Sequence, residues 1–117
     1  EWIELGMDSS TAREAVTEFA RTLEDMDKNL KSQEWIVGDR YSLADVALTP
    51  YLNRLSMLSM DPFWQRYPNV ADWYARIQER DSFKPALRDW VPADLTNSLA
   101  VNGAKSWPKV KEMIGSV

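Results

Sequence analysis

The sequence predicts an all-α fold, a bundle of helices built around one buried central helix. Apolar residues recur every three or four positions over most of the chain, which is the period of an amphipathic helix. Helix-capping patterns precede these segments, and no convincing alternation of apolar and polar residues predicts a strand. With 117 residues, of which 44% are hydrophobic and 27% charged, the chain is expected to form a single domain, 1–117.

The first elements are a short helical end and one long amphipathic helix. Residues 1–5 are predicted to end a helix, and Gly6 is typical of the residue that follows such an end. The pattern Thr11-x-x-Glu14 predicts a capping box at the next helix start, with Ser10 as the alternative cap. An apolar stripe follows at Ala12, Ala15, Val16, Phe19, Ala20, Leu23, Met26 and Leu30. The charged residues between them predict a solvated face: Glu14, Glu18, Arg21, Glu24, Asp25 and Lys28.

The most informative segment begins the central helix, which is predicted to span about residues 42–60. Ser42 is predicted to be its N-cap, with the side chain accepting from the Asp45 N–H while the Asp45 carboxylate accepts from the Ser42 N–H. Tyr41 and Val46 would complete a hydrophobic staple across this cap. Ser42 and Asp45 are also conceivable as a catalytic pair, but capping explains both residues without any chemistry.

The central helix is apolar on nearly all sides, which predicts that it is buried at the centre of the domain. A narrow polar stripe remains at Asp45, Thr49, Asn53 and Ser56. Pro50 lies inside the helix, where it removes one backbone hydrogen bond and is expected to produce a kink.

Two proline-led helices are expected next. Asp61 and Pro62 predict the N-cap and the first residue of a short helix through Trp64. Another helix opens at 67–69, and its apolar residues recur at i, i+3, i+4 and i+7, which places them on one face. These residues are Val70, Trp73, Tyr74 and Ile77.

The C-terminal part is expected to hold two helices separated by a loop. Asp81-Ser82 predicts the cap of a helix over about residues 83–90, where Pro85 is tolerated because it lies in the first turn. Residues 91–102 are predicted to form the loop. Ser106-Trp107-Pro108 predicts the start of a last helix, and Gly115 its end.

The composition excludes several kinds of site. The chain has no Cys and no His, which excludes disulfides, a catalytic Cys, a zinc–thiolate site and a Ser-His-Asp triad. No catalytic residue and no metal ligand is predicted. A net charge of −4 argues against nucleic-acid binding, and no apolar run reaches the ~20 residues of a membrane span. A cytoplasmic protein is expected.

The loop Trp35-Ile36-Val37-Gly38-Asp39, followed by the capped segment 41–51, closely resembles the C-terminal helical domain of cytosolic glutathione transferases. The resemblance continues through 68–73 and 80–86, so that it covers about residues 10–90. The segment 51–55 and the Trp-bearing tail are most similar to the bacterial and fungal branch related to β-etherases.

This resemblance implies an all-α domain that docks on an N-terminal thioredoxin-like domain, usually within a homodimer. In the family, the thioredoxin-like domain binds glutathione and activates its thiol, and the helical domain lines the pocket for a hydrophobic small molecule. These 117 residues show no βαβ pattern. No cofactor is therefore expected on this chain alone, and glutathione conjugation or ether cleavage is expected only together with that domain. Because Glu1 lies in a helical pattern, the chain is expected to be a fragment of a longer protein.

Five residues are candidates for the co-substrate pocket: Asn53, Arg54, Met57, Trp90 and Trp107. The two polar ones lie on the central helix, where each could reach an interdomain cleft or satisfy a neighbouring carbonyl. The other three could equally pack in the core. The alternative function is a non-catalytic helical interaction module of the same fold, whose apolar face would be covered by a partner or by self-association.

Overall fold

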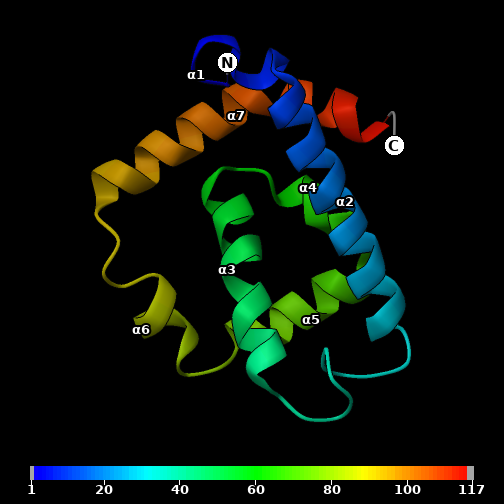
Figure 1. Ribbon diagram of the computed structural model, residues 1–117. Helices are drawn as coiled ribbons and strands as arrows, with labels where there is room; N and C mark the ends of the chain where they lie inside the picture. The colour runs from blue at the N-terminus through cyan, green and yellow to red at the C-terminus, as the bar shows by residue number, and fades with distance from the viewer. Residues whose placement is uncertain (1, 116–117) are drawn as a thin grey trace.

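Residues 2–115, the part of the chain that this computed structural model describes, form seven α-helices and one 3₁₀ helix joined by loops, with no β-strand (Figure 1). In chain order they are α1 (Trp2–Leu5), the 3₁₀ helix η1 (Gly6–Asp8), α2 (Ser10–Leu30), α3 (Leu43–Met57), α4 (Asp61–Gln65), α5 (Pro68–Gln78), α6 (Phe83–Leu87) and α7 (Ala93–Gly115). An isolated β-bridge joins Trp35 to Gly38 in the loop before α3. The predicted all-α fold is confirmed.

The N-cap of the long helix α2 lies one to two residues before the caps predicted from the sequence. Ser9 is the N-cap, in extended backbone geometry, and its hydroxyl accepts a 3.1 Å hydrogen bond from the Ala12 N–H. The predicted caps Thr11 and Ser10 are wrong, because three hydroxyl residues in a row offer the same capping chemistry. The predicted faces of α2 are correct: Ala20, Leu23, Met26 and Leu30 are buried, whereas the charged residues between them are exposed.

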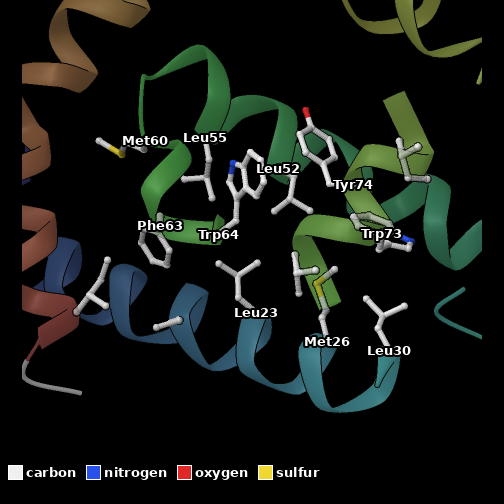
Figure 2. Packing of buried hydrophobic residues seen from close by; sticks show 14 of the residues in the cluster. Leu23, Met26, Leu30, Leu52, Leu55, Met60, Phe63, Trp64, Trp73 and Tyr74 are labelled. Atoms are coloured by element: carbon white, nitrogen blue, oxygen red, sulfur yellow. The ribbon is translucent and has the colours of Figure 1, made fainter. Parts of the chain in front are cut away.

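Helices α2 and α5 enclose the core together with α3 and α4. The four predicted apolar residues of α5 are all at most 2% exposed: Val70, Trp73, Tyr74 and Ile77. Figure 2 shows Leu23 and Met26 of α2 facing Leu52 of α3 and Trp64 of α4. The Trp64 and Tyr74 rings meet edge to face, with centroids 5.1 Å apart.

A carboxylate on α2 sets the start of α5. The N-cap of α5, Tyr67, makes no side-chain cap, and Asp27 replaces it from α2. Its Oδ1 accepts from the Asn69 N–H at 2.8 Å, and its backbone carbonyl accepts from the Asn69 side-chain amide at 3.2 Å. The two helices are therefore joined by polar contacts at one end as well as by the apolar core.

Two boundaries around α3 and α4 differ from the predicted ones. The central helix ends at Met57, not at residue 60, because Ser59 adopts a positive φ of 56° and turns the chain. Asp61 is the first residue of α4 and not its N-cap, a position held by Met60. The Asp61 carboxylate instead accepts a 2.9 Å hydrogen bond from the Ser56 hydroxyl.

The largest correction concerns the C-terminal part. The predicted loop over 91–102 and the predicted helix start at 106–108 are wrong, since α7 is one helix with Pro108 inside it. The preceding helix α6 is short and ends at Leu87 rather than near residue 90. Gly103 of α7 lies so close to α3 that a Cβ there would be 1.9 Å from the Leu58 carbonyl oxygen. This contact holds α7 across the ends of α2 and α3 (Figure 1).

None of the helices in the described range is long and apolar enough to cross a bilayer.

Candidate functional site

Helix α3 buries its polar stripe beside Leu52 and Leu55 and leaves other apolar residues exposed. Asp45, Thr49 and Asn53 are 0%, 6% and 5% exposed, although they form the polar stripe of the helix. On the other side, Leu43 is 83% exposed and Tyr51 55%. The predicted burial of α3 applies to one side of the helix, where its polar groups find partners in the interior, whereas apolar residues on the other side are left uncovered.

The buried Asp45 carboxylate joins three parts of the fold. Its Oδ1 accepts from the Ile36 N–H at 3.1 Å and from the Trp73 indole N–H at 2.8 Å. Its Oδ2 accepts from the Ser42 N–H at 2.9 Å, while the Ser42 hydroxyl, at the N-cap, accepts from the Ala44 N–H at 3.3 Å. A buried polar group needs such partners, because leaving it unpaired costs free energy. The pair Ser42 and Asp45 is thus engaged in holding the loop, α3 and α5 together.

The aromatic ring before this cap is held by its neighbours. Tyr41 meets Trp35 edge to face at 5.4 Å, and the Arg80 guanidinium carbon lies 3.5 Å from the Tyr41 ring centroid. Tyr41 and Val46 line the same small hollow of about 140 Å³, between α3 and α6. Their direct contact as a hydrophobic staple stays a prediction.

The outward side of α3 forms a continuous apolar surface, which we call the open face. Its apolar residues follow one another at helical spacing and are all exposed: Leu43, Val46, Ala47, Pro50 and Tyr51. The exposed, charged Arg54 ends the open face on its C-terminal side. The 140 Å³ hollow flanks it toward α6, and a hollow of about 320 Å³ flanks it toward α2, lined by Phe19, Leu48 and Tyr51 among others. Contiguous apolar surface of this kind marks an interaction site in soluble proteins.

The five predicted pocket residues do not converge on one site. Asn53 is buried and accepts a 3.2 Å hydrogen bond from Arg88 Nε, while its amide nitrogen lies 3.6 Å from the Met57 sulfur. Arg54 lies at the C-terminal end of the open face. Trp90 is 70% exposed and donates to the Ala86 carbonyl at 2.8 Å. Trp107 packs on the core, 6.5 Å from the ring of Phe63.

Met57 does line a cavity, of about 450 Å³, at the C-terminal end of α3. One of its wall residues, Trp64, carries a buried Nε1–H without a hydrogen-bond partner among the described residues. Burial raises the pKa of the Tyr74 phenol above its ordinary value of 10.0, and the nearby Ser56 and Arg88 oppose this rise. Sequence reasoning missed this site because both aromatic residues fitted the pattern of the core.

No three carboxylates within residues 2–115 gather in a way that would hold a metal ion. The acidic side chains of α2 lie on its solvated face, and two of them pair with basic side chains one turn away. These pairs are Arg21 with Glu18 at 2.8 Å and Lys28 with Glu24 at 2.9 Å. The sites of interest are therefore the open face and the 450 Å³ cavity.

Residues 6–81 match the protein family described as the glutathione S-transferase C-terminal domain. The chain is also similar to the tetrachloro-p-hydroquinone reductive dehalogenase of Sphingobium chlorophenolicum, at 33% identity over 68% of this chain and 32% of that protein. The disulfide-bond oxidoreductase YfcG of Escherichia coli is 34% identical over 53% of this chain and 28% of its own length. Elongation factor 1-gamma of Danio rerio is 33% identical over 63% of this chain and 17% of its own length.

The chain spans about a third of the length of the first two curated relatives that it matches, 32% and 30%. No solved structure matches it with comparable significance. The family match covers most of the chain, from η1 to the end of α5, and includes the Ser42–Asp45 cap and the open face of α3. This chain therefore belongs to the glutathione S-transferase C-terminal domain family.

Proposed function

We propose that this chain is the helical part of a glutathione-dependent transferase and that its open face docks on a thioredoxin-like, glutathione-binding domain. The proposal rests on the uncovered apolar stripe of α3, in which Leu43 is 83% exposed and Val46 is 46% exposed. A folded domain gains free energy when such surface is removed from water, at roughly 25 cal/mol per Å². The two hollows beside α3 would receive side chains from the docked domain.

The chemistry divides between the two parts. A glutathione thiol, with an ordinary pKa of about 8.5, must be deprotonated by donors aimed at its sulfur. The chain offers neither Cys nor His, and the partly buried Ser42 hydroxyl and the buried Asp45 carboxylate are engaged in capping. We therefore assign thiol activation to the docked domain and to this chain a wall of the hydrophobic co-substrate pocket.

Arg54 is the predicted pocket residue best placed for that role, since it ends the open face. Of the others, Asn53 supports the same helix from inside through Arg88. Met57 lines the cavity shared with α7, Trp90 donates to Ala86 of α6, and Trp107 lies against the core. Reductive removal of a leaving group, conjugation and ether cleavage all begin with the same thiolate attack, so any of them fits this division. Assembly as a homodimer is part of the proposal.

The test uses the natural gene product, isolated from its source cells with any sequence that precedes Glu1. We expect an intact mass well above 13.5 kDa and binding of glutathione measured by calorimetry, with no glutathione binding by the 117-residue chain. Val46→Glu on the open face should weaken the activity of the natural product by loosening the docked domain. Val101→Glu on α7 is the matched control, because Val101 is 54% exposed and lies off that face.

A natural product of 13.5 kDa, or a larger one that binds no glutathione, would overturn this proposal. The second candidate, a helical interaction module, would then remain. It rests on the same open face and on the similarity to elongation factor 1-gamma, whose name assigns it to translation rather than to glutathione chemistry. In that case Val46→Glu, but not Val101→Glu, should abolish self-association or partner binding.

A further inference from the structure

We propose that the domain docked on the open face carries carboxylates around an apolar centre, one that pairs with Arg54 and one that pairs with Arg80. The charge of the docked surface is a step beyond the proposed function, on which it rests, and it excludes a second copy of this chain as the occupant. The chain has 18 acidic and 14 basic residues, but its open face ends in an arginine and includes no carboxylate.

Arg54 is a cation without a counter-charge in the described part of the chain. It is exposed and follows Tyr51 by three positions, so the two side chains are neighbours on the helix surface. Four ion pairs form among the described residues, and Arg54 takes part in none of them. The acidic residue of α3, Asp45, is buried and accepts from donors of its own. Glu18 lines the hollow toward α2, but it pairs with Arg21 at 2.8 Å.

Arg80 is the cation on the α6 side of the open face. It lines the hollow of about 140 Å³ together with Val46, a residue of that face. Its guanidinium carbon lies 3.5 Å from the Tyr41 ring centroid, so the ring supports one flat side of the group. Since the N–H groups lie in the guanidinium plane, stacking leaves an edge that can bind a carboxylate through two parallel hydrogen bonds. Its sequence neighbours Glu79 and Asp81 form no ion pair with it in the described structure.

These charges argue against a second copy of the chain on the open face. In a two-fold dimer the same patch contacts itself, so the groups of the open face would have to satisfy one another. Both copies would bring arginines and neither would bring a free carboxylate, and like charges in an interface repel. A docked domain of different sequence has no such restriction. Homodimer assembly would then use another surface of the protein.

Docking makes the pairing important because it removes the two guanidinium groups from water. A charge that is covered and left unpaired loses its hydration without compensation, whereas a carboxylate opposite it restores strong hydrogen bonds. Burial of the apolar surface drives docking, and the ion pairs set the orientation of the docked domain. The same pairing would hold the Arg54 side chain in place as a wall of the co-substrate pocket.

The test is zero-length crosslinking of the natural gene product with a carbodiimide, which joins an amine to a carboxylate that it touches. Arginine does not react, so Arg54→Lys and Arg80→Lys supply the amines. We expect peptide mass spectrometry to find residues 54 and 80 each joined to an Asp or Glu outside the 117 residues. Lys109 and Asp8, whose charged atoms are 2.7 Å apart, are the internal control for the reaction. Lys105 is exposed on α7 without an ion pair among the described residues, and it should not crosslink to the docked domain.

Charge reversal gives an independent measurement. In the natural product, Arg54→Glu should lower the melting temperature by about 2–4 °C more than the matched reversal Lys105→Glu, because it places a carboxylate against the acidic group of the docked domain. In the 117-residue chain the two reversals should have equal effects, since neither side chain has an ion-pair partner among the described residues.

A missing crosslink from residue 54 or residue 80, or equal effects of the two reversals in the natural product, would overturn the acidic surface. A crosslink to the 117 residues of another copy, detected in a mixture of ¹⁵N-labelled and unlabelled protein, would overturn it as well. If the product binds glutathione, these failures leave the proposed function intact. A natural product of 13.5 kDa would overturn both proposals, so the two kinds of failure are distinguished.

Discussion

The indole N–H of Trp73 donates a 2.8 Å hydrogen bond to the carboxylate of Asp45, and both side chains are 0% exposed. The two residues are 28 positions apart, and the bond joins α5 to the first turn of α3. Because Asp45 also accepts from Ile36 and Ser42, the same carboxylate fixes the loop that precedes the open face. The orientation of that face therefore depends on a polar group in the core.

Trp73→Phe should destabilise the chain by about 2–4 kcal/mol, because it removes a hydrogen bond to the buried Asp45 carboxyl group and also leaves a gap where the larger indole packed. The measurement is the free energy of unfolding from urea denaturation. Trp90→Phe is the matched control and should change stability by less than about 0.5 kcal/mol, since Trp90 is 70% exposed. Equal losses in the two variants would contradict the role assigned to Asp45.

Asp27→Ala should lower the free energy of unfolding by about 1–2 kcal/mol, because it removes the cap that α2 provides for α5. Asp25→Ala is the control two residues away, on the solvated face of α2. Its effect should stay within about 0.5 kcal/mol. If Asp27→Ala is as mild as the control, the backbone of α5 is held by packing alone.

The helical pattern was sufficient to predict the parts of the fold in which periodicity and burial agree. The stripe of α2 and the four core residues of α5 were identified correctly, because their apolar spacing admits one orientation. Helix α7 could not be predicted in this way. Its first half contains Asn97, Asn102 and Gly103, which are weak helix formers, and a tertiary contact at Leu58 outweighs that propensity.

The candidate sites were harder to predict than the helices. The capping segment was found because Ser42 and Asp45 act within four residues of each other. The burial of the polar side of α3 was missed, since the partners of Asp45 and Asn53 include Trp73 and Arg88, far away in the sequence. No local signal separates a tryptophan whose indole N–H is paired in the core, such as Trp73, from one whose N–H is left unpaired, such as Trp64.

Gly103→Ala should destabilise the chain by about 1–3 kcal/mol or more, because its Cβ would meet backbone atoms of Leu58 that cannot rotate away. Gly115→Ala in the same helix is the matched control: nothing lies within 4 Å of a Cβ there. The control should leave thermal stability equal or slightly higher, because alanine favours helix. A Gly103→Ala chain that melts at the same temperature as the Gly115→Ala chain would show that α7 is not anchored at Leu58.

Stability should fall above about pH 10 as a result of the buried phenol of Tyr74. Burial raises the pKa of Tyr74 in the folded chain above its ordinary value of 10.0, so the unfolded chain loses this proton first as the pH rises. The folded state then binds more protons than the unfolded state, and the free energy of unfolding decreases by up to about 1.4 kcal/mol per pH unit between the two pKa values. Below pH 10 this contribution is fully present.

Urea denaturation at pH 9, 10 and 11 measures this effect. Tyr74→Phe cannot ionise at this position, so its stability should decrease less steeply over the same range. Burial also raises the pKa of Tyr67, which is why Tyr74→Phe should keep part of the slope and the double variant with Tyr67→Phe should lose more of it. A Tyr74→Phe chain that follows the slope of the unmodified protein would mean that the Tyr74 hydroxyl is reached by water in the folded state.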